Sequence, residues 1–322
     1  MKVAVTGGSG VVGSAVVRHL LQADHEVVAL ARSRQASEKL GELGAAVVSG
    51  DVLDKDSVGR LVKGCGRVFH VAGVNELCSR DPSHMWKVNV EGTATVVEQS
   101  ALMGVERLVL TSSAVTIGEE RKAKGHEGSR HRGHFLSEYE RSKTVAERMA
   151  FDHAGDLDVV AVNPSSVQGP GRSTGTGALL LAAARGRSPF LVDTTFSLVD
   201  VDDCARGHLL AADRGALGER YILSGAVLTV RQVVRIIDTI LGRRRRAWFL
   251  QPRLVSALAP VVETGSRALG RQAPLCRESA RVLFHGHSYD GRRATRELGV
   301  EYTTVEDTLE RSIRWFEGEG ML

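Results

Sequence analysis

Cysteine is scarce in this 322-residue chain, and its spacing argues against two kinds of site. No C-x-x-C pair occurs, and the four cysteines lie far apart, at Cys65, Cys78, Cys204 and Cys276. We therefore expect neither a zinc site nor a disulfide framework, and no bound metal. Cysteines that stay unpaired fit a reducing compartment, so we expect a cytoplasmic protein.

Long apolar runs and a strong net charge are also missing. No run approaches the roughly 18 apolar residues of a membrane-spanning helix, and no basic segment leads into a long apolar stretch. We expect no membrane span and no signal peptide. The net charge of +4 is small for this length and does not indicate a nucleic-acid partner.

The first half of the chain instead shows short apolar stretches that alternate with amphipathic segments. Val12, Val16 and Leu20, for example, form an apolar stripe at helical spacing between two such stretches. This alternation predicts an α/β fold with a Rossmann-type, doubly wound parallel sheet. The predicted strands are Lys2–Thr6, Glu26–Ala31, Ala45–Ser49, Arg67–Ala72, Arg107–Thr111 and Asp158–Asn163.

The pattern loosens after Pro164. The stretch Gly169–Gly177 is rich in Gly, Ser, Thr and Pro and is typical of a loop. We expect residues 166–322 to form mainly a smaller, C-terminal substrate-binding lobe, with segments that return to the sheet. Its predicted helices are Thr229–Leu241, Arg253–Leu269 and Val305–Phe316.

A glycine-rich turn joins the first predicted strand to the first predicted helix. Its glycines follow a G-x-x-G-x-x-G spacing, which suits a tight turn and lets a pyrophosphate approach the backbone at a helix N-terminus. An ordinary glycine turn is the alternative. The position between strand and helix favours a dinucleotide-binding domain over residues 1–165. The expected contacts are Gly7, Ser9, Gly10, Val11, Val12 and Gly13.

The end of the second predicted strand bears on the choice of cofactor. NAD-binding sites place an acid about 20 residues past the glycines to hold the ribose 2′-hydroxyl. This chain has Ala31 and Arg32 there. An arginine suits the 2′-phosphate of NADP(H), which we expect to be preferred, with NAD(H) as second choice. A solvated loop arginine is the alternative.

Two further strand ends offer cofactor contacts. Asp51 follows the third strand, where it could accept a hydrogen bond from the adenine amino group or cap the helix that starts near Asp54. Small residues follow the fourth strand and let backbone pass close to a cofactor. The expected contacts are Asp51, Val52, Val71, Ala72 and Gly73.

Tyr139 and Lys143 are four residues apart in a predicted helix, so both side chains lie on one face. An ammonium ~4 Å away can supply roughly the 4 kcal/mol that lowers a tyrosine pKa toward 7, although such pairs also occur by chance. Ser113 ends the fifth strand, where catalytic groups of parallel sheets gather, and could hold a substrate oxygen against the tyrosine. Ser112 is its rival, and a capping or turn serine is the alternative.

Taken in order, these motifs resemble those of extended short-chain dehydrogenases/reductases, the NAD-dependent epimerase/dehydratase superfamily. The resemblance covers nearly the whole chain. Within the superfamily the chain is most similar to dihydroflavonol-4-reductase-like proteins and hopanoid-associated sugar epimerases. The motifs that carry it are Thr6–Gly13, Asp51, His70–Gly73, Asn89–Thr93, Thr111–Ser113, Tyr139–Lys143 and Asn163–Pro164.

The resemblance implies a role for each matching residue. Tyr139 is implied to be the general acid/base, with Lys143 tuning it and binding the nicotinamide ribose. Ser113 is implied to orient the substrate oxygen. The backbone around Pro164 and Val167 is implied to face the nicotinamide.

Two further implications concern structure. Asn89 is implied to stabilise the cofactor region or to act structurally. The helices around Pro82–Met103 and Ser137–His153 lie where family members pair into a four-helix interface, so a homodimer is expected.

Departures from the family pattern narrow the chemistry. Ala114 follows Ser113, where sugar dehydratases carry an acid, so dehydration is not expected. Gly118 stands where plant flavonoid reductases carry a substrate-binding Asn, so a flavonoid substrate is not expected either.

We therefore expect an NADP(H)-dependent oxidoreductase, a carbonyl reductase or alcohol dehydrogenase, acting on a small-molecule carbonyl, alcohol or sugar. A nucleotide-sugar epimerase with tightly bound NAD(P) would use the same residues and is the nearest alternative. A non-catalytic dinucleotide sensor is the alternative from another class, although a sensor needs none of the three catalytic side chains.

The basic segment Glu119–His134 lies between the serine strand and the tyrosine helix and should border the substrate site. It could grip an anionic substrate as a lid, or it could be a solvated, mobile loop. A zinc site built from His126, His131 and His134 is not expected, because no carboxylate or cysteine lies at a suitable spacing.

Overall fold

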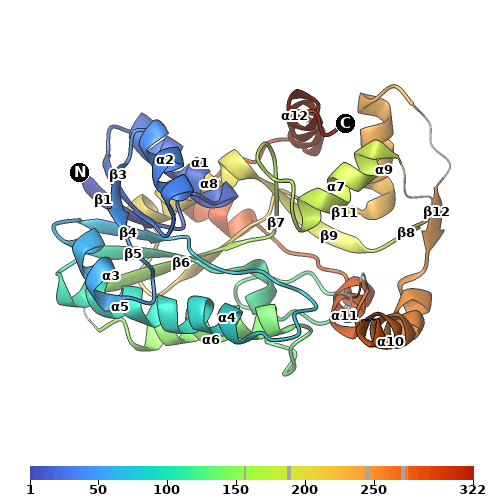
Figure 1. The fold of residues 1–322 in the computed structure, drawn as a ribbon, viewed down its shortest axis with the longest axis horizontal. Helices are drawn as coiled ribbons and strands as arrows, with labels where there is room; N and C mark the ends of the chain where they lie inside the picture. Colours follow the sequence, from blue (N-terminus) through green and yellow to red (C-terminus); the bar gives the residue numbers. More distant parts are fainter. Residues whose placement is uncertain (156, 187–189, 244–246, 270–272, 274) are drawn as a thin grey trace.

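The main sheet has seven parallel strands in the order β10-β6-β5-β4-β1-β2-β3 (Figure 1). The computed structural model describes the whole chain except residues 156, 187–189, 244–246, 270–272 and 274. Strand order reverses at β1, which confirms the Rossmann-type, doubly wound sheet. The strands are β1 (Lys2–Thr6), β2 (Glu26–Ala31), β3 (Ala46–Ser49), β4 (Arg67–His70), β5 (Arg107–Thr111), β6 (Asp158–Pro164) and β10 (Arg220–Leu223).

Helices cover both faces of this sheet (Figure 1). In β1, Val3 and Val5 pack into one apolar cluster, whereas Ala4 packs into another on the opposite side. A strand that is apolar on both faces must be covered on both, which explains the two helical layers. One layer contains α1 (Val11–Gln22), α2 (Arg34–Glu42) and α8 (Val201–Arg214); the other contains α3 (Lys55–Val62), α5 (Gly92–Leu102) and α6 (Glu138–Asp152).

The second half of the chain supplies α8 and β10 to this sheet layer and also forms a lobe beside it. The lobe has a three-stranded sheet, β11-β9-β7, and a pair, β12-β8. No helix in the described part of the chain has the length and apolar character to cross a membrane. The lobe elements are β7 (Ser166–Gln168), α7 (Thr176–Arg185), β8 (Phe190–Val192), β9 (Thr195–Asp200), β11 (Ala226–Thr229), α9 (Val230–Ile240), β12 (Trp248–Leu250), α10 (Pro252–Ala268), α11 (Arg277–His285) and α12 (Val305–Gly318).

Short helical segments complete the chain. α4 (Ser83–Trp86) and the π-helical turn η1 (Lys87–Glu91) lead into α5. The 3-10 turn η2 (Ala114–Ile117) follows β5, and a second π-helical turn, η3 (Ala294–Leu298), packs beside α8 and β10.

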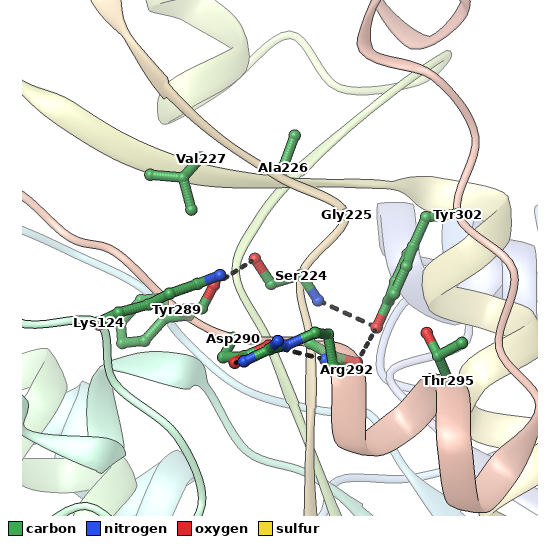
Figure 2. Close-up of a pocket in the computed structure, with 11 residues that line it drawn as sticks. Lys124, Ser224, Gly225, Ala226, Val227, Tyr289, Asp290, Arg292, Thr295 and Tyr302 are labelled. Carbon is green, nitrogen blue, oxygen red and sulfur yellow. Dashed lines mark hydrogen bonds and ion pairs between the residues drawn. The ribbon is translucent and has the colours of Figure 1, made fainter.

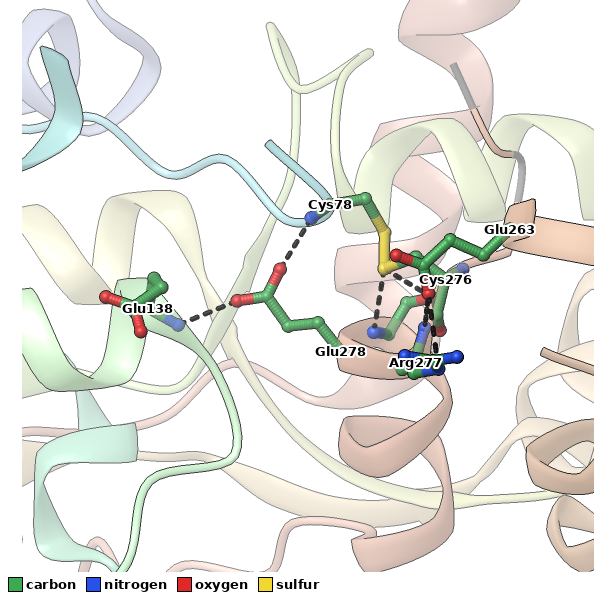
Figure 3. Close-up of a disulfide and its surroundings, with 7 residues drawn as sticks. Cys78, Glu138, Glu263, Cys276, Arg277 and Glu278 are labelled. Carbon is green, nitrogen blue, oxygen red and sulfur yellow. Dashed lines mark hydrogen bonds and ion pairs between the residues drawn. A yellow bond between two sulfur atoms is a disulfide. The ribbon is translucent and has the colours of Figure 1, made fainter. Parts of the chain in front are cut away.

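A disulfide joins Cys78 to Cys276, whose Cα atoms are 5.8 Å apart (Figure 3). The expectation that the cysteines stay unpaired is therefore wrong. The two residues are 198 positions apart in sequence, and only the fold brings the loop after β4 against the first turn of α11. Cys65 and Cys204 are free and buried. Cysteine usage thus no longer argues for a reducing compartment.

Candidate active site

The turn between β1 and α1 brings backbone N–H groups to the carboxyl edge of the sheet. Gly7 has a φ of +68°, and a Cβ there would lie 2.5 Å from the backbone nitrogen of Ala72. A Cβ on Gly13 would collide with the carbonyl oxygen of Gly7, so only glycine fits at either position. Gly10 is the N-cap of α1 and offers no side-chain cap, which leaves the first N–H groups of the helix to a bound anion.

Other residues of the turn add charge and backbone. Val11 and Val12 form the first turn of α1 and are partly exposed. The carbonyl oxygen of Ser9 accepts a hydrogen bond from Nζ of Lys39 at 2.8 Å. Lys39, which sequence analysis did not single out, therefore places a positive charge beside the turn.

Arg32 directly follows β2, and its side chain is 66% exposed. Its Nη1 lies 4.0 Å from Oδ2 of Asp51, at the edge between β2 and β3. Oδ1 of Asp51 accepts the N–H of Leu53 at 3.0 Å, and the N-cap of α3 is Asp54. Of the two roles expected for Asp51, capping therefore falls to Asp54. Val52 packs into the core, so only its backbone could contact a cofactor.

β4 ends at His70, two residues before the predicted end at Ala72. The His70 ring is fixed at both nitrogens: Nδ1 lies 2.7 Å from the Thr6 hydroxyl and Nε2 lies 3.0 Å from the Thr93 hydroxyl. Burial lowers the pKa of His70 to about 3, so the ring is neutral. This anchoring fixes the start of the Val71–Gly73 segment beside the glycine turn.

Asn89 holds the same loop from the other side. Its Oδ1 accepts the N–H of Val74 at 2.8 Å, and its Nδ2 donates to the Val74 carbonyl at 2.9 Å. Nδ2 also lies 2.9 Å from the hydroxyl of Ser142, next to Lys143. Gly73 lies so near that a Cβ on it would be 3.7 Å from Nζ of Lys143. Asn89 thus ties the loop after β4 to α6.

Ser113, Tyr139 and Lys143 converge at the carboxyl end of β5. The side chain of Ser113 acts on the Tyr139 hydroxyl and lowers its pKa, and it also accepts the N–H of Val115 at 3.5 Å, so both expected roles of Ser113 coexist. Lys143, only 5% exposed, donates from Nζ to the Thr111 carbonyl at 2.7 Å. The rival Ser112 has a buried hydroxyl without a hydrogen-bond partner among the described residues.

The pKa of Tyr139 is raised, whereas the sequence predicts that Lys143 lowers it. Burial raises the pKa of Tyr139, and the neighbouring Ser113 side chain and the charge of Arg172 offset this only in part. Lys143 donates from Nζ to the Thr111 carbonyl, and burial lowers the pKa of Lys143 itself to about 8. At neutral pH the structure therefore holds Tyr139 as a neutral phenol, the acid form.

Arg172 is a site residue that sequence analysis missed. It lies in the loop after β7, close enough for its charge to act on Tyr139. Its Nε is buried and has no hydrogen-bond partner among the described residues. A single arginine in a glycine-rich loop forms no periodic or motif signal, so only the fold reveals its place.

A buried network holds the backbone beneath Ser113. Asn163 donates from Nδ2 to the Ser113 carbonyl at 3.2 Å and to Glu147 at 2.5 Å. Glu147 also accepts from the Thr116 hydroxyl and from Arg220, both at 3.1 Å. The position of Ser113 is thus fixed by side chains from β6, α6 and β10.

Pro164 and Val167 stand at the end of β6 and in β7. Pro164 pairs with Leu223 across the sheet edge, and Val167 is 8% exposed within the core. Packing therefore occupies the Val167 side chain, and the backbone of this segment is what can face a ligand.

Part of the basic segment Glu119–His134 packs against the rest of the protein. Arg132 has a side chain only 1% exposed and pairs with Glu140 of α6, so a fully solvated loop is excluded. Lys124 lines a pocket of about 250 Å³ beside β10 and β11 (Figure 2). None of the predicted site residues lines this pocket; its other polar side chains are Ser224, Tyr289, Asp290, Arg292, Thr295 and Tyr302.

The chain is similar in sequence and fold to known nucleotide-dependent enzymes. A sequence model described as the NAD dependent epimerase/dehydratase family matches residues 3–224. A putative dihydroflavonol 4-reductase of Synechocystis sp. is 32% identical and is matched over 98% of this chain and 94% of its own. The sterol demethylase protein B of Methylococcus capsulatus is 30% identical over 100% of both chains. The crystal structure of a nucleoside-diphosphate-sugar epimerase from Pseudomonas aeruginosa is 26% identical, with a TM-score of 0.81 over 100% of this chain and 99% of that one.

Proposed function

We propose that the protein is an NADP(H)-dependent carbonyl reductase. The chain belongs to the NAD dependent epimerase/dehydratase family and is an enzyme of the extended short-chain dehydrogenase/reductase type. In the reverse direction it would act as an alcohol dehydrogenase. One observation carries the proposal: Tyr139 stays protonated at neutral pH and its pKa responds to the Ser113 side chain, one helical turn from Lys143.

The proton step follows from this arrangement. Tyr139 would give its proton to the substrate carbonyl oxygen, which the Ser113 hydroxyl holds in place. Bound NADPH would supply the hydride to the carbonyl carbon. Lys143 would hold the nicotinamide ribose, and its ammonium would stabilise the tyrosinate that the proton leaves behind. Solvent then restores the phenol proton.

The glycine turn and Arg32 support the choice of cofactor. A Cβ on Gly7 would collide with the backbone of Ala72 and one on Gly13 with the Gly7 carbonyl, so only glycine allows the tight turn that presents helix N–H groups to a dinucleotide pyrophosphate. Arg32 is exposed at the end of β2, where its guanidinium can reach a 2′-phosphate, and Lys39 adds a second positive charge nearby. We therefore favour NADP(H) over NAD(H).

Arg172 supports a substrate class. The charge of Arg172 acts on Tyr139, and its buried Nε has no hydrogen-bond partner within the described part of the chain, which suits a carboxylate or phosphate on the substrate. We infer that the substrate is an oxo or hydroxy compound with an acidic group near the reacting carbon.

An epimerase with tightly bound NAD(P) is the second candidate, favoured by the similarity to a solved nucleoside-diphosphate-sugar epimerase. Denaturing the purified protein and identifying any released nucleotide separates the two. A reductase should release little and should then take up NADPH. Stoichiometric release of NAD would favour the epimerase instead.

Tyr139→Phe tests the catalytic assignment. Phe keeps the ring but removes the proton donor, so turnover should fall by about 10²–10⁴-fold. NADPH binding should stay within about twofold, since the glycine turn, Arg32 and Lys143 are unchanged. A panel of aldehydes, ketones, oxo acids and nucleotide sugars, screened with the wild type, supplies the substrate.

Two variants complete that test. Ser113→Ala should lose turnover with little loss of NADPH affinity, whereas Lys143→Ala should lose both. Full activity of Tyr139→Phe on a genuine substrate would refute the assignment and favour a dinucleotide sensor.

A further inference from the structure

Glu119, His285 and His287 form a cluster outside the proposed catalytic set. Glu119 follows the left-handed Gly118 that ends η2, six residues after Ser113. His285 is the last residue of α11, and His287 lies two residues beyond it. Each of the three side chains offers one ligand atom, and these atoms all lie within 4.8 Å of one another. Two segments far apart in sequence thus meet at one point.

The cluster is buried and incompletely hydrogen-bonded. The side chains of Glu119, His285 and His287 are 1%, 6% and 14% exposed. Glu119 Oε1 lies 2.8 Å from Nδ1 of His287 and 3.4 Å from Nε2 of His285, but the second contact lacks hydrogen-bond geometry. Oε2 of Glu119 and Nε2 of His285 have no hydrogen-bond partner among the described residues. Such atoms are costly to bury unless something else binds them.

The charges around the cluster leave room for a cation. The Glu119 carboxylate faces the rings of both histidines, at 2.8 Å from His287 and 3.4 Å from His285. The other charged pair in contact is Glu140 with Arg132, and His131 and the Tyr289 hydroxyl also face these groups. The Arg132 guanidinium balances only one of the two carboxylates. A cation bound between Glu119 and the two histidines would balance the second carboxylate.

We propose that Glu119, His285 and His287 bind one divalent transition-metal ion, with zinc as the best match. Two imidazoles and a carboxylate are a ligand set that zinc accepts, at bond lengths of about 2.0–2.2 Å. Tetrahedral ligands at that distance lie about 3.4 Å apart, which is the separation of the Glu119 oxygen and the His285 nitrogen. Nδ1 of His287, now 2.8 Å from the Glu119 oxygen, would need to move outward and to exchange its present hydrogen bonds for the metal. Three protein ligands leave one position for water or an anion.

This site differs from the one that sequence analysis excluded. A zinc site in the basic segment would have used His126, His131 and His134, and none of these belongs to the cluster proposed here. The two histidines proposed here are more than 160 positions from Glu119, so no spacing rule could pair them. An ion there would join the segment after Ser113 to the lobe, independently of the disulfide.

Metal titration of the wild type is the primary test. The protein, with its disulfide intact, is treated with EDTA, desalted, and titrated with ZnCl₂ by calorimetry and with CoCl₂ by visible absorption. We expect one ion per chain, a dissociation constant of about 1 μM or tighter, and a Co²⁺ spectrum typical of four-coordination. Zinc at a hundredfold excess over that constant should raise the melting temperature by about 4 °C. No stoichiometric binding of either metal would overturn the proposal.

Variants then identify the ligands. Glu119→Gln, His285→Ala and His287→Ala should each weaken binding by at least about a hundredfold, since even an outer partner of a ligand contributes about 10–100-fold. His126→Ala and His134→Ala change exposed histidines of the neighbouring segment and should bind as the wild type does. NADPH binding and circular dichroism check that each variant folds. Binding that survives all three ligand variants, or that disappears in a Cys78→Ser/Cys276→Ser double variant, would place the ion elsewhere and refute the assignment.

Discussion

Replacing Cys78 with serine should lower the stability of the folded chain by an amount set by the loop that the disulfide closes. The bond joins residues 198 positions apart. In the chain-entropy model, a loop of that size removes about 18 cal/mol/K from the unfolded ensemble, or about 5 kcal/mol at 25 °C. Cross-links usually deliver about 2–4 kcal/mol.

The lower end of that range is expected here because the junction has a second tie. Oε2 of Glu278 accepts the N–H of Cys78 at 2.6 Å and would still hold the loop against α11 after the sulfur bond is lost (Figure 3). For a chain of 322 residues the unfolding entropy is about 0.7 kcal/mol/K, so a loss of about 2 kcal/mol lowers the melting temperature by about 3 °C.

Thermal unfolding followed by circular dichroism measures this effect, with and without dithiothreitol. Cys78→Ser, Cys276→Ser and the double variant should all melt at the temperature of the reduced wild type, because each removes the same bond. Dithiothreitol should not shift the double variant. Thiol titration of the oxidised, denatured wild type should find only Cys65 and Cys204. Four thiols in that sample, or a melting temperature unchanged by reduction, would refute the reasoning.

Four further predictions concern the site and the assembly. Arg32→Ala should weaken NADPH binding by roughly ten- to a hundredfold and leave NADH binding unchanged; fluorescence titration that finds NADH tighter in the wild type would contradict this. The ammonium of Lys143 is present below its pKa of about 8 and lost above it, so carbonyl reduction should decline as pH rises through 8, whereas Lys143→Arg should shift that decline to higher pH. Arg172→Gln should raise KM for acidic substrates by more than tenfold but hardly change KM for neutral analogues; equal effects on both would remove its binding role. Light scattering should show a homodimer rather than a 34.6 kDa monomer, and Leu102→Glu or Val145→Glu, on exposed faces of α5 and α6, should dissociate it.

The parts of the site that depend on neighbouring residues could be predicted from the sequence. The spacing of Gly7 and Gly13 between a strand and a helix follows from local geometry, and the structure shows that a Cβ fits at neither position. Tyr139 and Lys143 share a helix face for the same reason. The contacts of each side chain could not be predicted in the same way. Lys143, for example, donates to the Thr111 carbonyl, which belongs to another element.

The parts that were missed depend on contacts between residues far apart in sequence. Cys78 meets Cys276 only because the lobe folds back onto the loop after β4. Arg172 approaches Tyr139 from a loop whose composition predicts nothing beyond a turn. The ends of strands were also predicted inexactly, because β4 ends at His70 whereas the apolar pattern continues to Ala72. Local sequence propensity does not encode tertiary contacts of this kind, so spacing rules could not predict these contacts.

Glu278 shows how the lobe is coupled to the proposed catalytic helix. Its two carboxylate oxygens accept one N–H from Cys78 and one, at 2.7 Å, from Glu138, the first residue of α6. A carboxylate at a helix N-terminus is favoured by the free N–H groups and the positive end of the helix dipole. The residue after Glu138 is Tyr139, so the side chain that fixes the lobe to the loop after β4 also fixes the turn that carries the proposed acid. A shift of α11 would therefore disturb, through one side chain, both the loop after β4 and the first turn of α6 next to the proposed acid.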